Sequence, residues 1–300
     1  MLVVDGLVEG AALTLSHWPG NTTPRALKAD TSTEIVLNHL AMGEAARFDL
    51  VVNNHYDTDG LLSVWSALAG PAALEHRDLL VAAAEAGDFA AFPSSAAVKL
   101  SLALQGDGPG SPRARAGGDD ARADAQARPE VPAMLRAPDD FEARWRPGWA
   151  RLHDAMESFA AGRSTVHEDP ERRLSVVTLA PSLAAWGHHP TQSDGVSTAI
   201  AHHAQGEWIA VGHPTARGWR WRVVRAFHAW AETVVRPMRP RRPSAPAAAR
   251  LREVERSTAG RWQPGRGALG PALVFVDDAR QPADSALDPE SLGTILRASM

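Results

Sequence analysis

The chain has 300 residues, of which 44% are apolar and 22% charged, a formal net charge of −4 and no cysteine. Such a composition suits a globular protein of one large or two ordinary domains, and the negative charge argues against general nucleic-acid binding. Disulfides and thiolate metal sites are excluded, so any metal ion must be held by His, Asp, Glu or backbone oxygens. We find neither a signal peptide nor an apolar run of the roughly 20 residues that span a bilayer, and we expect a cytoplasmic protein without a membrane segment.

The first 43 residues predict short strands, a loop and a helix. Residues 1–16 contain one or two strands, with residues 13–15 the clearest, and His17 lies just past them in a turn-rich loop. Thr31 followed by Glu34 fits a capping box at the start of an apolar helix. His17 is therefore either an ordinary loop residue or, because it follows a strand, a further ligand or a substrate contact.

Residues 48–63, FDLVVNNHYDTDGLLS, carry the strongest functional signal. A short apolar strand at 50–52 breaks into a polar turn and resumes as a helix over 61–68. Open α/β sheets place their sites at such points, outside the carboxyl ends of the strands. His55, Asp57 and Asp59 alternate, so in an extended loop all three converge on one point. One imidazole and two carboxylates suit Mn²⁺, Mg²⁺, Zn²⁺ or Fe²⁺.

The pattern H-x-D-x-D-G-x-x-S, formed by His55, Asp57, Asp59, Gly60 and Ser63, resembles the first metal-binding motif of the DHH phosphoesterases. The whole chain is similar to a family of uncharacterised conserved proteins. The DHH resemblance implies a site for a pair of divalent metal ions, with manganese foremost, that cleaves phosphoester or phosphoanhydride bonds. The alternative is that the aspartates only cap the following helix, because Asp accepts the free N–H groups of a helix start.

The same resemblance suggests further site residues. Residues 78–84 form either a strand or a helix, and Asp88 falls near the end of that element, where the resemblance implies another metal ligand. A strand over 174–179 leads to His188 and His189, although Gly187 stands where the DHH motif has its Asp. The resemblance makes His188 a candidate ligand and implies that His189 is near the scissile phosphate. We expect His189 or His17 to assist the leaving group by proton transfer.

We expect an α/β fold, with a mainly parallel sheet flanked by helices in the N-terminal half and an α+β C-terminal portion. Residues 1–105 form the first domain, and 106–133, poor in apolar residues, form a disordered insertion or linker. Residues 134–300 then either form a second domain or complete the first.

The C-terminal portion adds one basic feature. Residues 218–230 alternate, with Arg220 and Arg222 on one side of a predicted strand. This arginine row either contacts phosphate, which guanidinium groups bind well, or forms a solvated face.

We therefore expect a divalent-metal-dependent hydrolase that acts on a small phosphoester, a nucleotide or a short oligonucleotide. The competing hypothesis is a catalytically inactive, DHH-like scaffold that binds a ligand or a protein partner.

Overall fold

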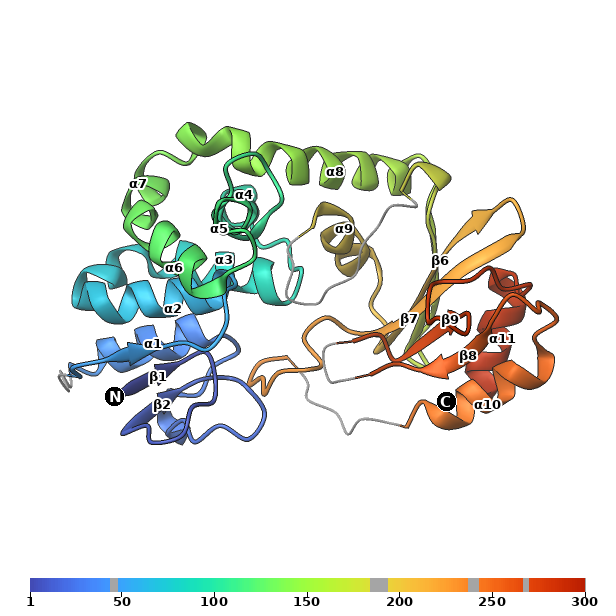
Figure 1. Cartoon of the computed structure of the whole chain (residues 1–300), viewed down its shortest axis with the longest axis horizontal. Helices are drawn as coiled ribbons and strands as arrows, with labels where there is room; N and C mark the ends of the chain where they lie inside the picture. The colour runs from blue at the N-terminus through green and yellow to red at the C-terminus, as the bar shows by residue number, and fades with distance from the viewer. Residues whose placement is uncertain (44–47, 184–193, 237–242, 267–269, 300) are drawn as a thin grey trace. The chain divides into compact units, whose positions relative to one another are not determined.

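The computed structural model describes residues 1–43, 48–183, 194–236, 243–266 and 270–299 (Figure 1). The chain forms two compact units. The N-terminal unit comprises Met1–Arg151, Thr191–Thr198 and Trp230–Met238, and the C-terminal unit comprises Leu152–Pro190, Ala199–Ala229 and Arg239–Met300. The division thus differs from the predicted one, because the boundary falls inside a helix and two later segments belong to the N-terminal unit.

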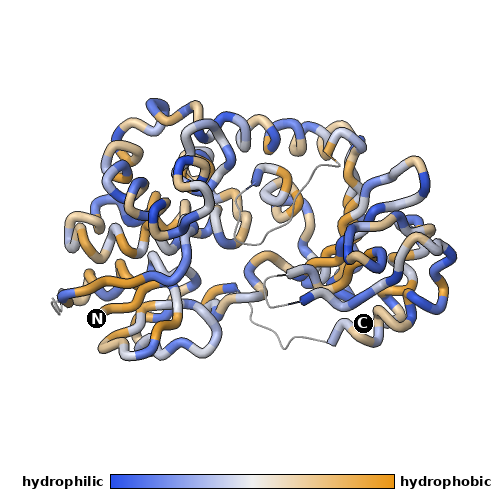
Figure 2. The backbone as a smooth tube through the Cα atoms, viewed as in Figure 1, coloured by the Kyte–Doolittle hydropathy of each residue, from blue (hydrophilic) through white to orange (hydrophobic). Residues whose placement is uncertain are grey.

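A three-stranded parallel sheet lies in the N-terminal unit, with the order β2-β1-β3. Its strands are β1 (Leu2–Val4), β2 (Leu13–Leu15) and β3 (Val51–Val52). The apolar residues of β1 are buried, as is usual for strands of a parallel sheet, and Figure 2 shows this segment as hydrophobic. The predicted parallel sheet in the N-terminal half is confirmed.

Helices supply the rest of the N-terminal unit. Thr31 caps the first α-helix, as its sequence predicts, by accepting a hydrogen bond from the Glu34 backbone N–H. The second α-helix begins at Thr58, earlier than predicted, and residues 78–84 belong to a helix. The helices are η1 (Arg25–Leu27), α1 (Ser32–Ala41), α2 (Thr58–Ala69), η2 (Gly70–His76), α3 (Arg77–Asp88), α4 (Ser95–Gln105), α5 (Pro112–Ala116), α6 (Asp120–Ala127), η3 (Arg128–Glu130), α7 (Val131–Arg136), η4 (Pro138–Phe141) and α8 (Glu142–Ala160), which continues into the C-terminal unit.

Residues 106–133 are folded, and the prediction of a disordered linker is wrong. They form α5, α6 and η3, and their alanines Ala116, Ala123 and Ala127 are at most 5% exposed. Alanine has the highest helix propensity and loses no side-chain entropy on burial, so a segment without large apolar residues still packs as helix. Arg113 also reaches out of this segment to donate a 2.7 Å hydrogen bond to the Tyr56 carbonyl.

The C-terminal unit contains a mixed six-stranded sheet with the order β4-β5-β6-β7-β9-β8, in which only β5 and β6 are parallel. Trp262 and Phe275 are central to its core and are at most 1% exposed. Its elements are β4 (Thr165–Asp169), β5 (Leu174–Thr178), η5 (Pro181–Leu183), α9 (Gly195–His203, which begins in the N-terminal unit), β6 (Trp208–Thr215), β7 (Gly218–Arg225), α10 (Ala245–Val254), β8 (Arg261–Pro264), β9 (Leu273–Val276) and α11 (Pro289–Ser299). The α+β character of this portion is as predicted, and within the described ranges no helix has the length and apolarity needed to cross a membrane.

Candidate metal centre

The carboxyl ends of the three parallel strands carry acidic and histidine residues. Asp5 follows β1 directly, His17 lies two residues past β2, and His55 lies three residues past β3. Asp57 follows as the N-cap of α2, and Asp88 is the last residue of α3. Because parallel strands end at the same edge of a sheet, these side chains, distant in sequence, meet in one place.

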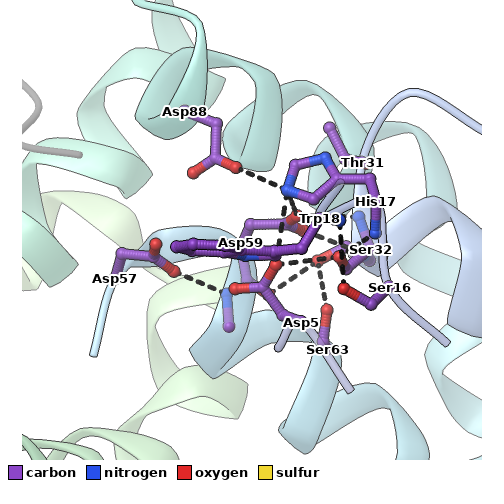
Figure 3. A network of polar contacts seen from close by, with 12 residues as sticks. Asp5, Ser16, His17, Trp18, Thr31, Ser32, Asp57, Asp59, Ser63 and Asp88 are labelled. Atoms are coloured by element: carbon purple, nitrogen blue, oxygen red, sulfur yellow. Dashed lines mark hydrogen bonds and ion pairs between the residues drawn. The ribbon is translucent and has the colours of Figure 1, made fainter. Parts of the chain in front are cut away.

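Four of the residues at this edge form a first cluster, which we call the inner cluster: Asp5, His17, Asp59 and Asp88. Each is at most 1% exposed. The Nε2 atom of His17 lies 3.4 Å from Asp5 Oδ1, 3.6 Å from Asp59 Oδ2 and 3.3 Å from Asp88 Oδ2, and Figure 3 shows these side chains converging. Three carboxylates therefore surround one imidazole nitrogen without contact with water.

Several of these buried atoms have no hydrogen-bond partner among the described residues. They are Asp5 Oδ2, His17 Nε2 and both carboxylate oxygens of Asp88. An unsatisfied buried polar atom is costly, and an unsatisfied buried carboxylate costs more. The arrangement therefore calls for positive charge at its centre, supplied by protons or by a cation.

The spacing of the inner cluster fits a cation. The three contacts of His17 Nε2 span 3.3–3.6 Å. Ligand atoms held tetrahedrally at about 2.0–2.1 Å from one ion are separated by about 3.3–3.4 Å. The donor set of one imidazole nitrogen and three carboxylate oxygens suits Mn²⁺, Zn²⁺ or Fe²⁺, and the oxygens also suit Mg²⁺.

The His17 ring is oriented as that of a metal-binding histidine would be. Its Nδ1 atom lies 2.7 Å from the carbonyl oxygen of Asp30, so Nδ1–H donates there and the neutral ring keeps a lone pair on Nε2. A histidine that binds a metal through one nitrogen usually donates from the other in this way. Trp230 packs edge-on against the ring at a centroid distance of 4.9 Å, which helps to exclude water. His17 is 1% exposed, so its position fits a ligand better than the proton donor expected from the sequence.

A second group, the outer cluster, consists of Asp5, His55 and Asp57. His55 Nε2 lies 2.8 Å from Asp57 Oδ2 and 3.2 Å from Asp5 Oδ2. Its Nδ1 atom lies 3.0 Å from the side-chain oxygen of Asn54, which accepts the Nδ1 hydrogen, so Nε2 faces the two carboxylates and, in the neutral ring, would offer its lone pair to a metal ion. Asp5 thus turns one oxygen to each cluster, as a carboxylate that bridges two metal ions would.

The two aspartates of the sequence motif also cap helices. Asp57 Oδ1 accepts from the Gly60 N–H at 2.7 Å, and the two oxygens of Asp59 accept from Ser32 N and Thr33 N, each at 2.7 Å. An ionised carboxylate has about four acceptor sites, so a capping bond leaves capacity for a cation. Capping explains neither the burial of Asp88 nor the orientation of His17.

Burial opposes ionisation of the carboxylates. It is the main reason that the pKa of Asp59 rises to about 7, and the charge of Asp5 adds to the effect. Burial, followed by the charge of Asp57, likewise raises the pKa of Asp88 well above its ordinary value. Both residues therefore tend to hold protons when no cation is bound.

The charged forms of the two imidazoles and of Asp5 stabilise one another. Burial lowers the pKa of His55, but the charges of Asp57 and Asp5 outweigh it and raise that pKa to about 12. The pKa of His17 is raised for the same reason, with Asp5 and Asp88 as its main partners. Burial raises the pKa of Asp5, but the charge of His55 and the close contacts with the rings of His17 and His55 bring it below its ordinary value. A metal ion would take over this charge compensation and release the protons.

Asp5 is the residue that our sequence reasoning missed. A signal was present, because Asp5 follows the buried run Leu2–Val4 as directly as the later motif follows its own strand. Asp5 also has a φ of 45°, in the left-handed region that few non-glycine residues adopt. Strained backbone of this kind is often retained at functional sites.

Five of the seven predicted site residues belong to this centre. His188 and His189 fall outside the described residues. The remaining five candidates, His17, His55, Asp57, Asp59 and Asp88, are all in the two clusters. Asp59 lies in the first turn of α2 rather than in an extended loop. That turn separates Asp59 from Asp57 and directs them to different clusters.

Comparison with known proteins assigns a family without a function. Residues 1–298 match the family of unknown function DUF6687. The chain belongs to DUF6687. No curated protein and no solved structure matches it. In this DUF6687 protein, the two clusters are therefore the features that bear on function.

One test of the centre in this DUF6687 chain uses Gly60. A Cβ atom at Gly60 would collide with the side-chain nitrogen of Asn53 and lie 2.9 Å from Asp5 Oδ2 and 3.0 Å from Asp57 Oδ1. We expect Gly60→Ala to lower stability by about 1–3 kcal/mol, as overpacking does, and to weaken metal binding about 10- to 100-fold. Urea unfolding and metal titration measure both effects.

The matched control is Gly293→Ala in α11, where the nearest atom to a new Cβ is Val176 Cγ2 at 3.3 Å. This change should leave metal affinity unaltered. Equal metal affinity in wild type and Gly60→Ala would contradict a role for Asp5 and Asp57, the carboxylates next to Gly60, in metal binding.

Proposed function

We propose that this protein is a divalent-metal-dependent hydrolase that cleaves a phosphoester in a small phosphorylated substrate. His17, Asp59 and Asp88 would hold one ion together with Asp5, and His55 and Asp57 would hold a second, again together with Asp5. Manganese is the first candidate metal, with Mg²⁺, Zn²⁺ and Fe²⁺ as alternatives, and a cytoplasmic location is part of the same proposal.

The observation that supports the proposal most directly is the set of unsatisfied buried atoms at the centre. Asp5, His17 and Asp88 together present four side-chain atoms without hydrogen-bond partners among the described residues. Keeping such groups buried is expensive unless they bind something. The resemblance of residues 48–63 to the DHH phosphoesterases supplies the reaction class.

The two clusters suit different tasks. The inner cluster is fully buried, whereas the His55 side chain is 21% exposed. Substrate therefore approaches from the His55 side. Trp18 lies there, with its ring 5.1 Å from that of His55, and restricts water. A bound metal pair supplies Lewis acidity toward phosphoryl oxygens and lowers the pKa of a water molecule.

The first experiment measures metal content and phosphoester hydrolysis together. We expect one or two equivalents of Mn, Zn or Fe in protein purified without chelators, and hydrolysis of a chromogenic phosphoester that depends on the metal. Asp57→Asn removes a charged ligand of the outer cluster and the partner of His55 at 2.8 Å. It should lose about one equivalent and at least 100-fold in activity, more than a supporting residue costs.

Asp119→Asn is the matched control, because Asp119 caps α6 in the same way that Asp57 caps α2. It should retain metal and activity. No metal in either the wild type or the variants, even after soaking with Mn²⁺, would favour the catalytically inactive scaffold that binds a ligand or protein partner.

A further inference from the structure

The C-terminal unit has a basic sheet face that the metal centre does not involve. In the pairing of β6 with β7, His213 lies opposite Arg220 and Val211 lies opposite Arg222. Residues opposite each other in an antiparallel pair project from the same face. Trp221 alternates with the two arginines and packs in the core on the other face. The predicted arginine row is therefore a real face of the sheet.

This face is hollowed into a cleft. The cleft has a volume of about 540 Å³, and its lining includes His213, Arg220 and Arg222. Arg266, which follows β8, and Arg280, which follows β9, complete its positive charge. The other lining residues are apolar residues and a glycine, so no acidic residue lines the cleft among the described residues. Clefts of about 300–1,000 Å³ accept organic ligands rather than a single small ion.

A backbone turn positions Arg280, and charged neighbours surround Arg220 and His213. Arg280 has a φ of 62°, a left-handed backbone conformation, in a turn closed by its N–H bond to the Asp277 carbonyl at 3.0 Å. Arg220 makes an ion pair with Asp284 at 3.1 Å. Burial, together with the charges of Arg220 and Arg222, keeps the pKa of His213 below its ordinary value, although Asp284 opposes this. The lining of the cleft thus contains four arginines and His213, and Asp284 makes an ion pair with one of these arginines.

We propose that this cleft binds the phosphate groups of a nucleotide-sized polyphosphate ligand. Planar guanidinium groups bind phosphate oxygens in pairs of parallel hydrogen bonds. The apolar part of the lining, which includes Val211 and Val274, would contact the organic part of the ligand. This proposal goes beyond the hydrolase proposal and does not depend on it, since its residues are all in the C-terminal unit.

The test is isothermal titration calorimetry on the full chain in EDTA, so that the metal centre does not contribute. The probes are inorganic triphosphate and ATP. We expect one saturable site for both, and tighter binding of ATP if the apolar walls contact the base. Arg220→Gln and Arg280→Gln should each weaken binding about tenfold or more, because each removes a charged hydrogen-bond donor.

The matched control is Arg217→Gln, at an exposed position in the turn between β6 and β7 and outside the cleft. It removes the same charge from the same hairpin and should leave the Kd within about twofold. Absence of saturable binding of either probe, or an equal loss in Arg217→Gln, would overturn the proposal. Because metal is absent throughout, neither result bears on the hydrolase.

Discussion

Asp5→Asn is expected to remove both metal ions and to lower hydrolysis at least 100-fold, beyond the 10- to 100-fold loss typical of residues that only support a ligand. Asp5 Oδ1 lies 3.4 Å from His17 Nε2, and Asp5 Oδ2 lies 3.2 Å from His55 Nε2. It is the one residue shared by the two clusters found among the described residues. Asn tolerates the left-handed backbone of Asp5, so the variant should fold.

Asp88→Asn tests whether the loss of both ions is specific to the residue that the two clusters share. Asp88 belongs to the inner cluster alone, so its variant should lose about one equivalent of metal where Asp5→Asn loses two. Asp107→Asn is the matched control, because its side chain is 69% exposed and pairs with Arg151 on the surface. Elemental analysis of the four proteins, with circular dichroism to verify folding, decides the matter. Two equivalents retained in Asp5→Asn would contradict a bridging role.

Metal removal should make the stability of the protein fall as pH rises. The folded pKa of Asp59, about 7, and that of His55, about 12, both exceed their ordinary values of 3.8 and 6.5. A raised folded pKa stabilises the protein below the unfolded pKa, and this stability is lost as pH rises through the folded value. The window for Asp59 runs from pH 3.8 to about 7, and the window for His55 runs from pH 6.5 to about 12. The pKa of Asp5 is lowered, so its effect on stability has the opposite sign: the stabilisation is present above its ordinary pKa of 3.8 and is lost as pH falls below that value.

Added metal should reverse this trend. Metal ions displace the protons of the centre, so metal affinity rises with pH. At about 100 times the Kd, binding adds about 2.7 kcal/mol, or roughly 5–10 °C in Tm for a unit of this size. Thermal melts at several pH values, with EDTA or with Mn²⁺, measure the difference. Asp88→Asn in EDTA should depend less on pH, because the raised pKa of Asp88 is then absent. Identical pH profiles with and without metal would contradict the centre.

Local patterns in the sequence were sufficient for much of the N-terminal unit. The short strands, the Thr31 cap and the helix after the His/Asp motif depend on neighbours in the chain, and all are present. The same local pattern identified Asp57 and Asp59 as site residues. It did not predict their division between two clusters, because that division depends on where α2 begins. Asp57, as the N-cap, places the start of α2 earlier than the apolar residues suggest.

Long-range contacts were beyond the reach of local patterns. The Asp30 carboxylate accepts hydrogen bonds from the backbone N–H groups of Val234 and Val235 and from the Arg236 guanidinium at 2.7 Å. No periodicity links positions separated by 204 to 206 residues. The prediction of a disordered linker over residues 106–133 was wrong for another reason: a rule based on large apolar residues undervalues packed alanines.

The contacts of Asp30 have a consequence for how this protein is made and how it can be divided. The carbonyl of Asp30 orients His17, and its carboxylate anchors residues 234–236 of the segment that also brings Trp230 against the His17 ring. During synthesis, His17 cannot acquire its full surroundings until the ribosome has released more than two hundred further residues. A gene truncated after the first continuous stretch of the N-terminal unit would encode all six residues of the two clusters but not this cover. The six side chains of the proposed metal centre are therefore all encoded in the first third of the chain, but the surroundings of His17 are completed only by residues 230–236.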